Sequence, residues 1–345
     1  MKTLHETLDN LRKESFAVAV DAHTAGEPIR VILDGYDEEL ERKQSMPQRQ
    51  RWIKNNDDEL RTRTMREPRG HAAMFGAIVM EPPSEEADAG VLFPYPSGYA
   101  DMCGHGSMGV ATILLELGLI EPDRGENEVK LETPAGLVRT VASYGEGKVD
   151  EVQLFGTPSF FSESVDVELA GRGTIGVDLS YGGNFFGIVR VDELGLSLNL
   201  NQLGELNSVA HEIMEEINEM PDVMLERPEM GPVPLERIRF VGGEENEKNV
   251  VIHEGAVIDR SPCGTGTCSQ LAWEYHRGDI GKRDVNRYRS IIDTEFRGEV
   301  VREETTGGRT KILPRVTGSS YITGVNYFLT SSGDPLANGF SVSHA

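Results

Sequence analysis

One stretch of clustered apolar residues stands out along the chain and predicts a buried helix, and a second stretch predicts another helix by its composition. Residues 108–117 (MGVATILLEL) are apolar on nearly every face, which is typical of a helix enclosed by a core, and Gly118 is its expected end. Residues 268–276 (CSQLAWEYH) also have a helical composition, and Gly278 follows them as a stop signal. A glycine-rich segment precedes each stretch, so each predicted helix begins at a turn.

Polar and charged residues mark the segments that are expected at the surface. Residues 37–63 are highly charged and predict a solvated helix or arm, and residues 82–86 and 242–245 predict surface turns. Residues 1–14 are polar and lack the apolar segment of a secretory signal. Because no stretch approaches the ~18 uninterrupted apolar residues of a membrane span, we expect a cytoplasmic protein with no membrane partner.

The composition narrows the class of protein further. With 345 residues, of which 38% are apolar and 26% charged, the chain is long enough for about two domains of roughly 150 residues. The 57 acidic residues exceed the 34 basic ones and give a formal charge of −23, so nucleic acid is not an expected partner. Only nine of the basic residues are lysines, which motivates the hypothesis of a salt-adapted, halophilic source; the alternative is an ordinary acidic enzyme.

The chain has three cysteines, Cys103, Cys263 and Cys268, and an odd number does not predict a disulfide framework. No CxxC or HExxH pair accompanies them and the histidines are scattered, so we expect no metal. Cys268 lies inside the second predicted helix, where a packed small residue is the expected role.

The other two cysteines share their surroundings, because residues 103–107 (CGHGS) and 263–267 (CGTGT) both read Cys-Gly-x-Gly-Ser/Thr. The copies are 160 residues apart, about one domain length, and each leads into one of the predicted helices. Backbone N–H groups at such a turn and the helix dipole lower the pKa of a thiol and attract a carboxylate. The repeat therefore predicts one site built from two thiol-bearing turns.

Two thiols of this kind can invert a carbon centre if the halves of the chain pack as pseudo-symmetric lobes. One thiolate then removes a proton from the α-carbon of an amino acid, and the opposite thiol returns a proton to the other face. The helix N-termini hold the carboxylate and stabilise the charge that develops on it. No electron sink such as pyridoxal phosphate is needed, and the turns lack the GxxxxGK[ST] and GxGxxG patterns of nucleotide sites, so no cofactor is expected.

At these residues the sequence resembles the proline racemase family, which includes 4-hydroxyproline 2-epimerases and trans-3-hydroxyproline dehydratases. The resemblance covers nearly the whole chain, and its longest motif is the most specific. The matching segments are 21–28 (DAHTAGEP), 67–71 (EPRGH), 102–106 (MCGHG), 181–186 (YGGNFF), 259–267 (DRSPCGTGT) and 322–324 (ITG).

The resemblance implies an α/β (α+β) fold of the diaminopimelate-epimerase type, with two pseudo-symmetric lobes that each wrap strands around a central helix. Residues 1–155 then form the first lobe, which carries Cys103, and residues 156–320 form the second, which carries Cys263. Residues 321–345 rejoin the first lobe. The likeness also implies a monomer or a homodimer with a small imino acid as substrate.

The resemblance assigns roles as well, with Cys103 and Cys263 as the catalytic acid/base pair. His105 and Asp259 match positions that contact the ring nitrogen of the substrate. A carboxylate four residues before Cys263 suits an ammonium group, and the alternative for Asp259 is a structural pair with Arg260. The backbone cradle of the substrate carboxylate matches Gly104, His105, Gly264 and Thr265.

The second thiol bears on the reaction, because dehydratases of the family typically carry threonine where this chain has Cys263. Racemisation or epimerisation is therefore favoured over water elimination, and a trans-3-hydroxyproline dehydratase is the alternative. A non-enzymatic binder is disfavoured because both thiols are present. Phe75 stands where proline racemases tend to carry an aromatic wall, which favours proline. His253 stands where they often carry a second phenylalanine, and a histidine suits a ring hydroxyl, so 4-hydroxyproline stays open.

Overall fold

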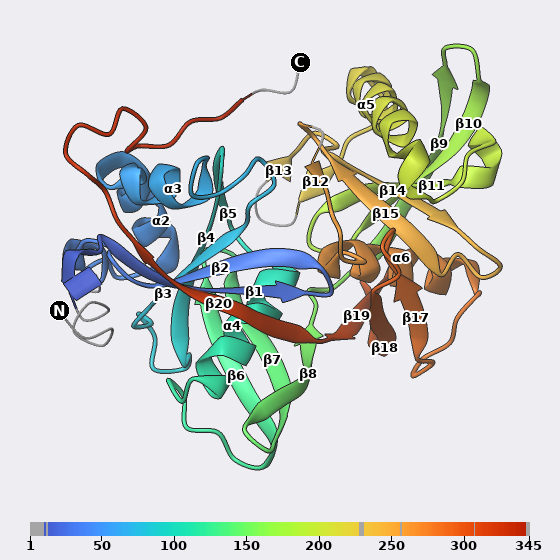
Figure 1. Ribbon diagram of the computed structural model, residues 1–345. Coiled ribbons are helices and arrows are strands. Elements are labelled where there is room, and N and C mark those ends of the chain that lie inside the picture. Colours follow the sequence, from blue (N-terminus) through green and yellow to red (C-terminus); the bar gives the residue numbers. More distant parts are fainter. Residues whose placement is uncertain (1–9, 12, 228–230, 256, 307, 343–345) are drawn as a thin grey trace. The chain divides into compact units, whose positions relative to one another are not determined.

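The computed structural model describes residues 10–342 except 12, 228–230, 256 and 307 (Figure 1). Most of the polar segment 1–14 and the last three of residues 321–345 therefore lie outside the described residues. The chain divides into two compact units. Unit 1 comprises residues 1–24, 28–152 and 319–345, and unit 2 comprises residues 25–27 and 153–318. The three residues 25–27 thus belong with unit 2, although the residues on both sides of them belong with unit 1.

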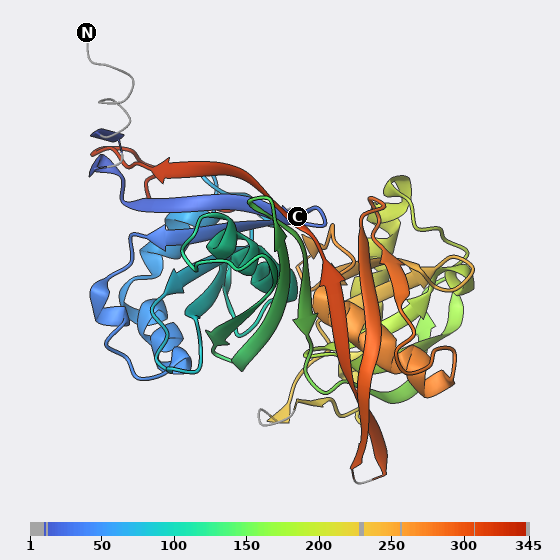
Figure 2. The same ribbon diagram turned by 90° about the horizontal axis from the view of Figure 1, so that it is seen from below.

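Unit 1 contains strands that surround one buried helix, α4. Its strands are β1 (Ala17–Thr24), most of β2 (Glu27–Asp34), β3 (Gly76–Met80), β4 (Ala89–Tyr95), β5 (Gly98–Ala100), β6 (Gly125–Thr133), β7 (Gly136–Gly145), the first part of β8 (Lys148–Phe155) and β20 (Ser320–Phe328). Its helices are the single turn η1 (Glu38–Leu40), α2 (Met46–Asn56), α3 (Asp58–Met65) and α4 (Gly104–Glu116). β1 lies between β2 and β20, and β20 runs antiparallel to it (Figure 2).

Helix α4 confirms the helix predicted from its apolar pattern. Every residue from Gly104 to Leu115 is buried, and α4 packs against β1, β3, β7 and β20. A helix enclosed on all sides needs apolar or small residues at every position, which is why the pattern shows no polar face.

The expectation that the charged segment 37–63 forms a solvated helix or arm has to be corrected, because part of this segment is buried. It folds as η1, α2 and most of α3, and Leu40 and Ile53 belong to the core of unit 1. Arg49 and Arg61 are also buried, and both guanidinium groups donate hydrogen bonds to backbone carbonyls. The acceptor is Glu41 for Arg49 and Tyr95 for Arg61. Buried arginines satisfied in this way make a core-facing helix look polar in the sequence.

Unit 2 repeats the arrangement around α6. Its strands are β9 (Phe160–Leu169), β10 (Gly173–Tyr181), β11 (Phe185–Arg190), β12 (Glu226–Arg227), β13 (Gly231–Pro232), β14 (Arg237–Gly242), β15 (Lys248–His253), β16 (Val257–Ile258), β17 (Asn286–Arg289), β18 (Glu295–Thr306) and β19 (Arg309–Gly318). Its helices are η2 (Val191–Leu194), η3 (Leu200–Gln202), α5 (Leu203–Glu219) and α6 (Gly264–Arg277).

Helix α6 packs against β9, β10, β11, β18 and β19, and Gly278 ends it in a left-handed conformation, as predicted. The larger apolar core of unit 2 lies between its strands and α5.

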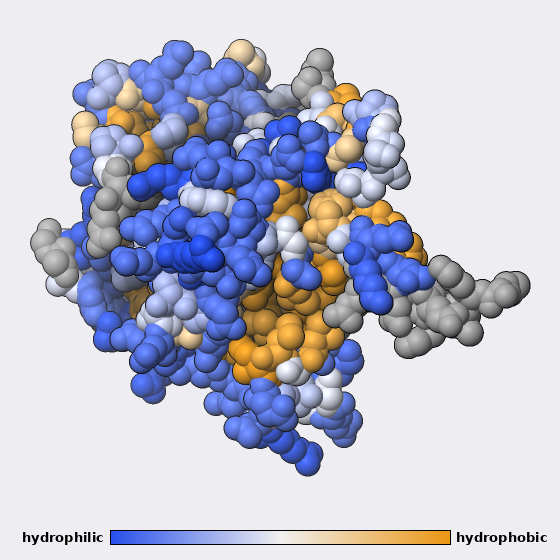
Figure 3. All heavy atoms as spheres, turned by 90° about the vertical axis from the view of Figure 1, so that its left-hand side faces the viewer, coloured by the Kyte–Doolittle hydropathy of each residue, from blue (hydrophilic) through white to orange (hydrophobic). Residues whose placement is uncertain are grey.

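The surface agrees with the high content of charged residues. Hydrophilic side chains cover most of the face shown in Figure 3, and hydrophobic ones form smaller areas between them. Among the described residues, no helix has both the length and the apolar character needed to cross a membrane.

Candidate active site

The first thiol-bearing turn lies in unit 1, where Cys103 is the N-cap residue of α4. Its Sγ accepts a hydrogen bond from the backbone N–H of Gly106 at 3.3 Å, and Cys103 is buried. The same sulfur lies 3.3 Å from Nδ1 of His105. Cys103 and His105 therefore form a buried thiol–imidazole pair, in which the imidazole can take or return the thiol proton.

An aromatic wall stands beside this pair. The ring of Phe75 meets the ring of His105 edge to face at 5.2 Å, and Tyr95 stacks on Phe75 at 5.9 Å. The backbone carbonyl of His105 accepts a hydrogen bond of 2.9 Å from Oγ1 of Thr24. Phe75, His105 and Cys103 thus lie close together in unit 1.

The second turn lies in unit 2 and has the same cap. Cys263 is the N-cap residue of α6, it is buried, and its Sγ accepts a hydrogen bond from the N–H of Gly266 at 3.4 Å. The sulfur also lies 3.8 Å from Oγ1 of Thr265. Unlike Cys103, which is extended, Cys263 has φ +63°, a region that costs a residue with a side chain about 1–3 kcal/mol. The surrounding contacts must hold this strained thiol in place.

The third residue after each cysteine is a glycine, and a side chain there would lie tight against the sulfur. A Cβ built on Gly106 would lie 3.1 Å from Sγ of Cys103, and a Cβ built on Gly266 would lie 3.1 Å from Sγ of Cys263. In both copies the N–H of that glycine is also the donor to the sulfur. The repeated Cys-Gly-x-Gly pattern therefore reflects the space needed for a capping sulfur.

Asp259 supports the second turn through Ser261. Its Oδ1 accepts hydrogen bonds of 2.8 Å from both the N–H and the hydroxyl of Ser261. The Ser261 hydroxyl accepts in turn from the N–H of Cys263 at 3.0 Å. Arg260 pairs with Glu27 instead, at 3.2 Å between Nη1 and Oε1. The ion pairs of the described residues therefore do not include the alternative, a structural pair between Asp259 and Arg260.

Burial dominates the acid–base properties of the second turn. It raises the pKa of the Cys263 thiol to about 12, and the charge of Asp259 acts in the same direction. The guanidinium of Arg239, the N–H of Gly266 and the Thr265 hydroxyl act against this rise. The depressed pKa predicted from the helix end is therefore wrong for Cys263, because the helix-end contacts are outweighed by the loss of water around a buried sulfur.

Glu27 shares this environment. Burial raises its pKa to about 8, and the nearby charge of Asp259 adds to the rise, while Arg260 opposes it. Burial and the like charge outweigh the ion pair with Arg260.

The remaining predicted residues lie in unit 2. Gly264 and Thr265 open α6 directly after Cys263, as Gly104 opens α4 in unit 1. His253 is the half-buried last residue of β15, beside β16, which leads to Asp259. Cys268 is buried inside α6 with its sulfur against Gly156, in the position of a packed residue.

Two residues escaped the sequence reasoning. Glu27 lies within the motif 21–28, but nothing there indicates its link to Arg260. Arg239 is fully buried on β14 near Cys263, and its only signal is a charged residue inside the apolar run IRFV. A cation in such a run is costly to bury, which makes it a candidate for function.

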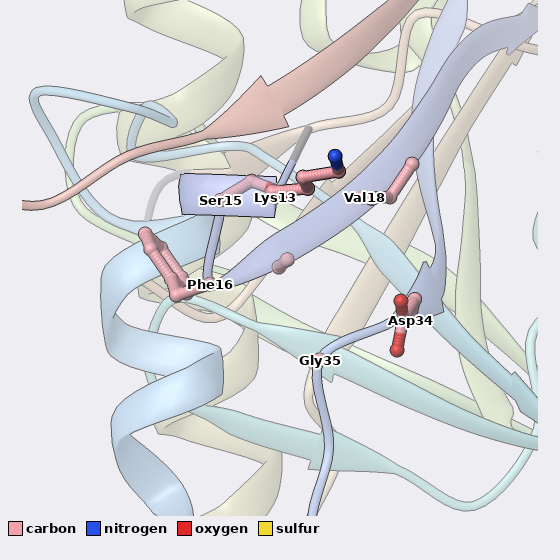
Figure 4. A pocket seen from close by; sticks show the side chains of 7 residues that line it. Lys13, Ser15, Phe16, Val18, Asp34 and Gly35 are labelled. Atoms are coloured by element: carbon pink, nitrogen blue, oxygen red, sulfur yellow. The ribbon is translucent and has the colours of Figure 1, made fainter. Parts of the chain in front are cut away.

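Two hollows lie on unit 1, and neither is lined by a residue of 103–107 or 263–267. The larger, of 590 Å³, is lined by residues that include Lys13, Phe16 and Asp34 (Figure 4), and neither hollow is lined by Cys103. Residues of the motifs 21–28 and 67–71 line the smaller one, of 230 Å³. The described residues contain no group of three or more histidine, cysteine, aspartate or glutamate side chains arranged to hold a metal ion.

Comparisons with known proteins point in one direction. A family model described as Proline racemase matches residues 19–341. The chain is 37% identical to the proline racemase of Clostridioides difficile over 328 residues, which cover 93% of this chain and 97% of that protein. It is 32% identical to the trans-L-3-hydroxyproline dehydratase of Xenopus tropicalis over 335 residues, covering 93% and 94%.

A solved structure extends the likeness to the fold. The crystal structure of a hydroxyproline epimerase from Agrobacterium vitis, with bound trans-4-OH-L-proline, matches with a TM-score of 0.84 and 29% identity. The match covers 95% of this chain and 96% of that one. The expected α/β (α+β) fold class is therefore confirmed.

Proposed function

The chain belongs to the proline racemase family, and we propose that it is an isomerase that inverts the α-carbon of proline or 4-hydroxyproline. Cys103 and Cys263 are the acid/base pair of this proposal. The observation that carries it is the matched geometry of the two turns, in which each thiol caps a buried helix and accepts from the third N–H after it. A structural role explains one such turn but not two that carry the same ionisable group.

The proposed reaction needs one thiolate and one thiol on opposite faces of the substrate. The thiolate takes the α-proton, and the electron pair of the broken C–H bond moves into the carboxylate to give an enediolate. The opposite thiol then donates its proton to the other face, and the pair returns to form the new C–H bond. N–H groups at the two helix ends stabilise the enediolate while it exists.

The local surroundings suggest how the resting enzyme is protonated. Because burial raises the pKa of Cys263, this thiol holds its proton in the free enzyme. Cys103 has an imidazole 3.3 Å away that can accept its proton. We therefore assign Cys103 as the base that attacks first and Cys263 as the acid. In this proposal, Asp259 faces the ring ammonium and Phe75 covers the ring.

Activity of single-thiol variants tests the proposal. Cys103→Ser and Cys263→Ser are each expected to lose racemisation by about 10²–10⁴-fold, the range typical of an acid or base in the transition state. Cys268→Ser, which changes a buried thiol outside the turns, is the matched control and should keep the parent rate. Racemisation is followed by polarimetry and by deuterium exchange at the α-carbon. Parent rates in both turn variants would disprove the two-thiol mechanism.

The same assay distinguishes the substrates. L-Proline and trans-4-hydroxy-L-proline are compared side by side, because Phe75 favours the first and His253 is suited to the hydroxyl of the second. The resemblance to a dehydratase supports water elimination as the second candidate function. Rapid loss of the hydroxyl from trans-3-hydroxy-L-proline, without inversion at the α-carbon, would favour that candidate over the isomerase.

A further inference from the structure

Arg239 is an unusual residue in unit 2, because its guanidinium is fully buried and has no carboxylate ion-pair partner among the described residues. It lies on β14 between the core residues Ile238 and Phe240 and has no exposed surface. Nε donates to the side-chain oxygen of Gln270 at 2.6 Å, and Nη1 donates to the carbonyl of Pro262 at 2.7 Å. Nη2 has no hydrogen-bond partner among the described residues.

The guanidinium of Arg239 lies close to the second thiol, that of Cys263. Pro262, whose carbonyl it binds, is the residue before Cys263. A Cβ built on Gly266 would lie 2.7 Å from Nη1 of Arg239 and 3.1 Å from Sγ of Cys263. Nη1 of Arg239 and Sγ of Cys263 are therefore separated by no more than the sum of these distances, and both lie beside Gly266.

The nearby carboxylates are already engaged elsewhere. Glu274 accepts hydrogen bonds of 2.6 Å from Gln270 and from the Tyr288 hydroxyl, and burial raises its pKa to about 7. Asp259 accepts from Ser261. The ion pairs of the described residues include none with Arg239. Its hydrogen bonds go to neutral acceptors, and Glu274 and Asp259 act on it only through their charges. Burying a charge in this way is costly unless an anion appears beside it.

We propose that Arg239 is a positioning residue whose guanidinium, held close to the turn by the Pro262 carbonyl, stabilises the thiolate of Cys263. His105 plays the corresponding part for Cys103, so the two thiols have the same cap but different charge partners. The consequence for catalysis rests on the proposed function, whereas the effect on the Cys263 thiol does not.

Several charged or titratable groups act on the pKa of the Cys263 thiol. Asp259, on the segment that follows β16, raises the pKa of Cys263, and Arg239, on β14, lowers it. Cys268, on α6, is also buried and interacts with both Cys263 and Arg239. Glu274 and Tyr288 act on Arg239 from α6 and β17. The test therefore removes Arg239 alone and leaves the other groups in place.

Thiol reactivity gives a direct readout. In a Cys103→Ser/Cys268→Ser background only Cys263 remains, and its alkylation by iodoacetamide is measured against pH. At a pH below the thiol pKa, Arg239→Gln should slow alkylation by about 10- to 100-fold, because a cation at this range and an effective dielectric constant of about 20 shifts a pKa by about one to two units. Arg239→Lys should restore part of the rate.

Two comparisons keep the result unambiguous. Arg237→Gln is the matched control, since Arg237 lies two residues earlier on β14 and pairs with Glu236. It should leave the pH profile of alkylation unchanged. A misfolded Arg239 variant would expose Cys263 and speed alkylation, which is opposite to the predicted change. An unchanged or faster profile in Arg239→Gln would overturn the proposal.

The catalytic consequence is measured separately with all three cysteines present. Because Cys263 is the acid of the proposed reaction, Arg239→Gln should move the falling limb of the pH profile of kcat/KM to higher pH, and Arg237→Gln should not. If Cys263 proves not to be catalytic, its serine variant keeps racemising while the alkylation result still stands. The failure of the proposed function and the failure of the Arg239 proposal are therefore distinguishable.

Discussion

Gly266 affects both the packing and the chemistry of the second turn, because it lies beside the guanidinium of Arg239 and the sulfur of Cys263. It is the third residue of α6, and its N–H donates a hydrogen bond to the capping sulfur of Cys263. A Cβ at this position would come within 2.7 Å of Nη1 of Arg239, closer than real contacts allow. We therefore predict that Gly266→Ala destabilises the protein and impairs the thiol together.

The size of the effect follows from three contributions. Overpacking a filled site costs about 1–3 kcal/mol. If Arg239 moves aside, its hydrogen bond to the Pro262 carbonyl is lost as well, at about 1.5–3 kcal/mol for a charged donor. Alanine recovers up to about 1 kcal/mol through its better helix propensity. With all three contributions present, the expected net loss in the free energy of unfolding is about 1.5–6 kcal/mol.

Urea unfolding and racemisation of the same samples check this prediction. Gly204→Ala is the matched control, because Gly204 is also near the start of a helix and a Cβ there would meet no atom within 4 Å. It should be neutral or stabilise by up to about 1 kcal/mol. If Gly266→Ala were as stable and as active as the parent, the close packing of Arg239, glycine and thiol would be refuted.

Three further predictions concern the surroundings of the site. The raised pKa of Glu27 means that the folded state holds a proton the unfolded state has released, so stability should fall as pH rises from about 4.5 to about 8; Glu27→Gln should flatten this slope in urea unfolding. Ser261→Ala removes the link between Asp259 and the N–H of Cys263, and should cost about 1–3 kcal/mol in thermal or urea unfolding and lower the racemisation rate. The excess of acidic residues predicts that activity and stability rise in molar salt, and maxima in dilute buffer would refute a salt-adapted source.

The sequence predicted the parts of the molecule that local patterns encode. The helices expected over 108–117 and 268–276 are part of α4 and α6. The first could be predicted because an enclosed helix is apolar or small at nearly every position, and the second from its helical composition and the glycine that follows it. The repeated Cys-Gly-x-Gly pattern predicted that each cysteine stands at the start of a helix, and Cys103 and Cys263 are the N-cap residues of α4 and α6.

Other features depend on residues that are distant in the sequence. Arg239 binds Gln270, 31 residues further along, and no local pattern announces that a buried arginine will find neutral acceptors. The positive φ of Cys263 has no signal either, because glycine is the residue expected in that region. The pKa of Cys263 was misjudged because the helix end is visible in the sequence, whereas the burial of the sulfur is not.

The pairing of β1 with β20 has a consequence for how the chain is made. Ala17 pairs with Phe328, so one edge of β1 lacks its partner strand until almost the last segment of the chain has been synthesised. At the usual rate of about 5–20 residues per second, the ribosome needs about 15–60 s to deliver that partner. During this time β1 has β2 on one side and an open edge on the other, a template for wrong pairing. Unit 1 thus begins the chain but cannot be completed until after unit 2 has been synthesised.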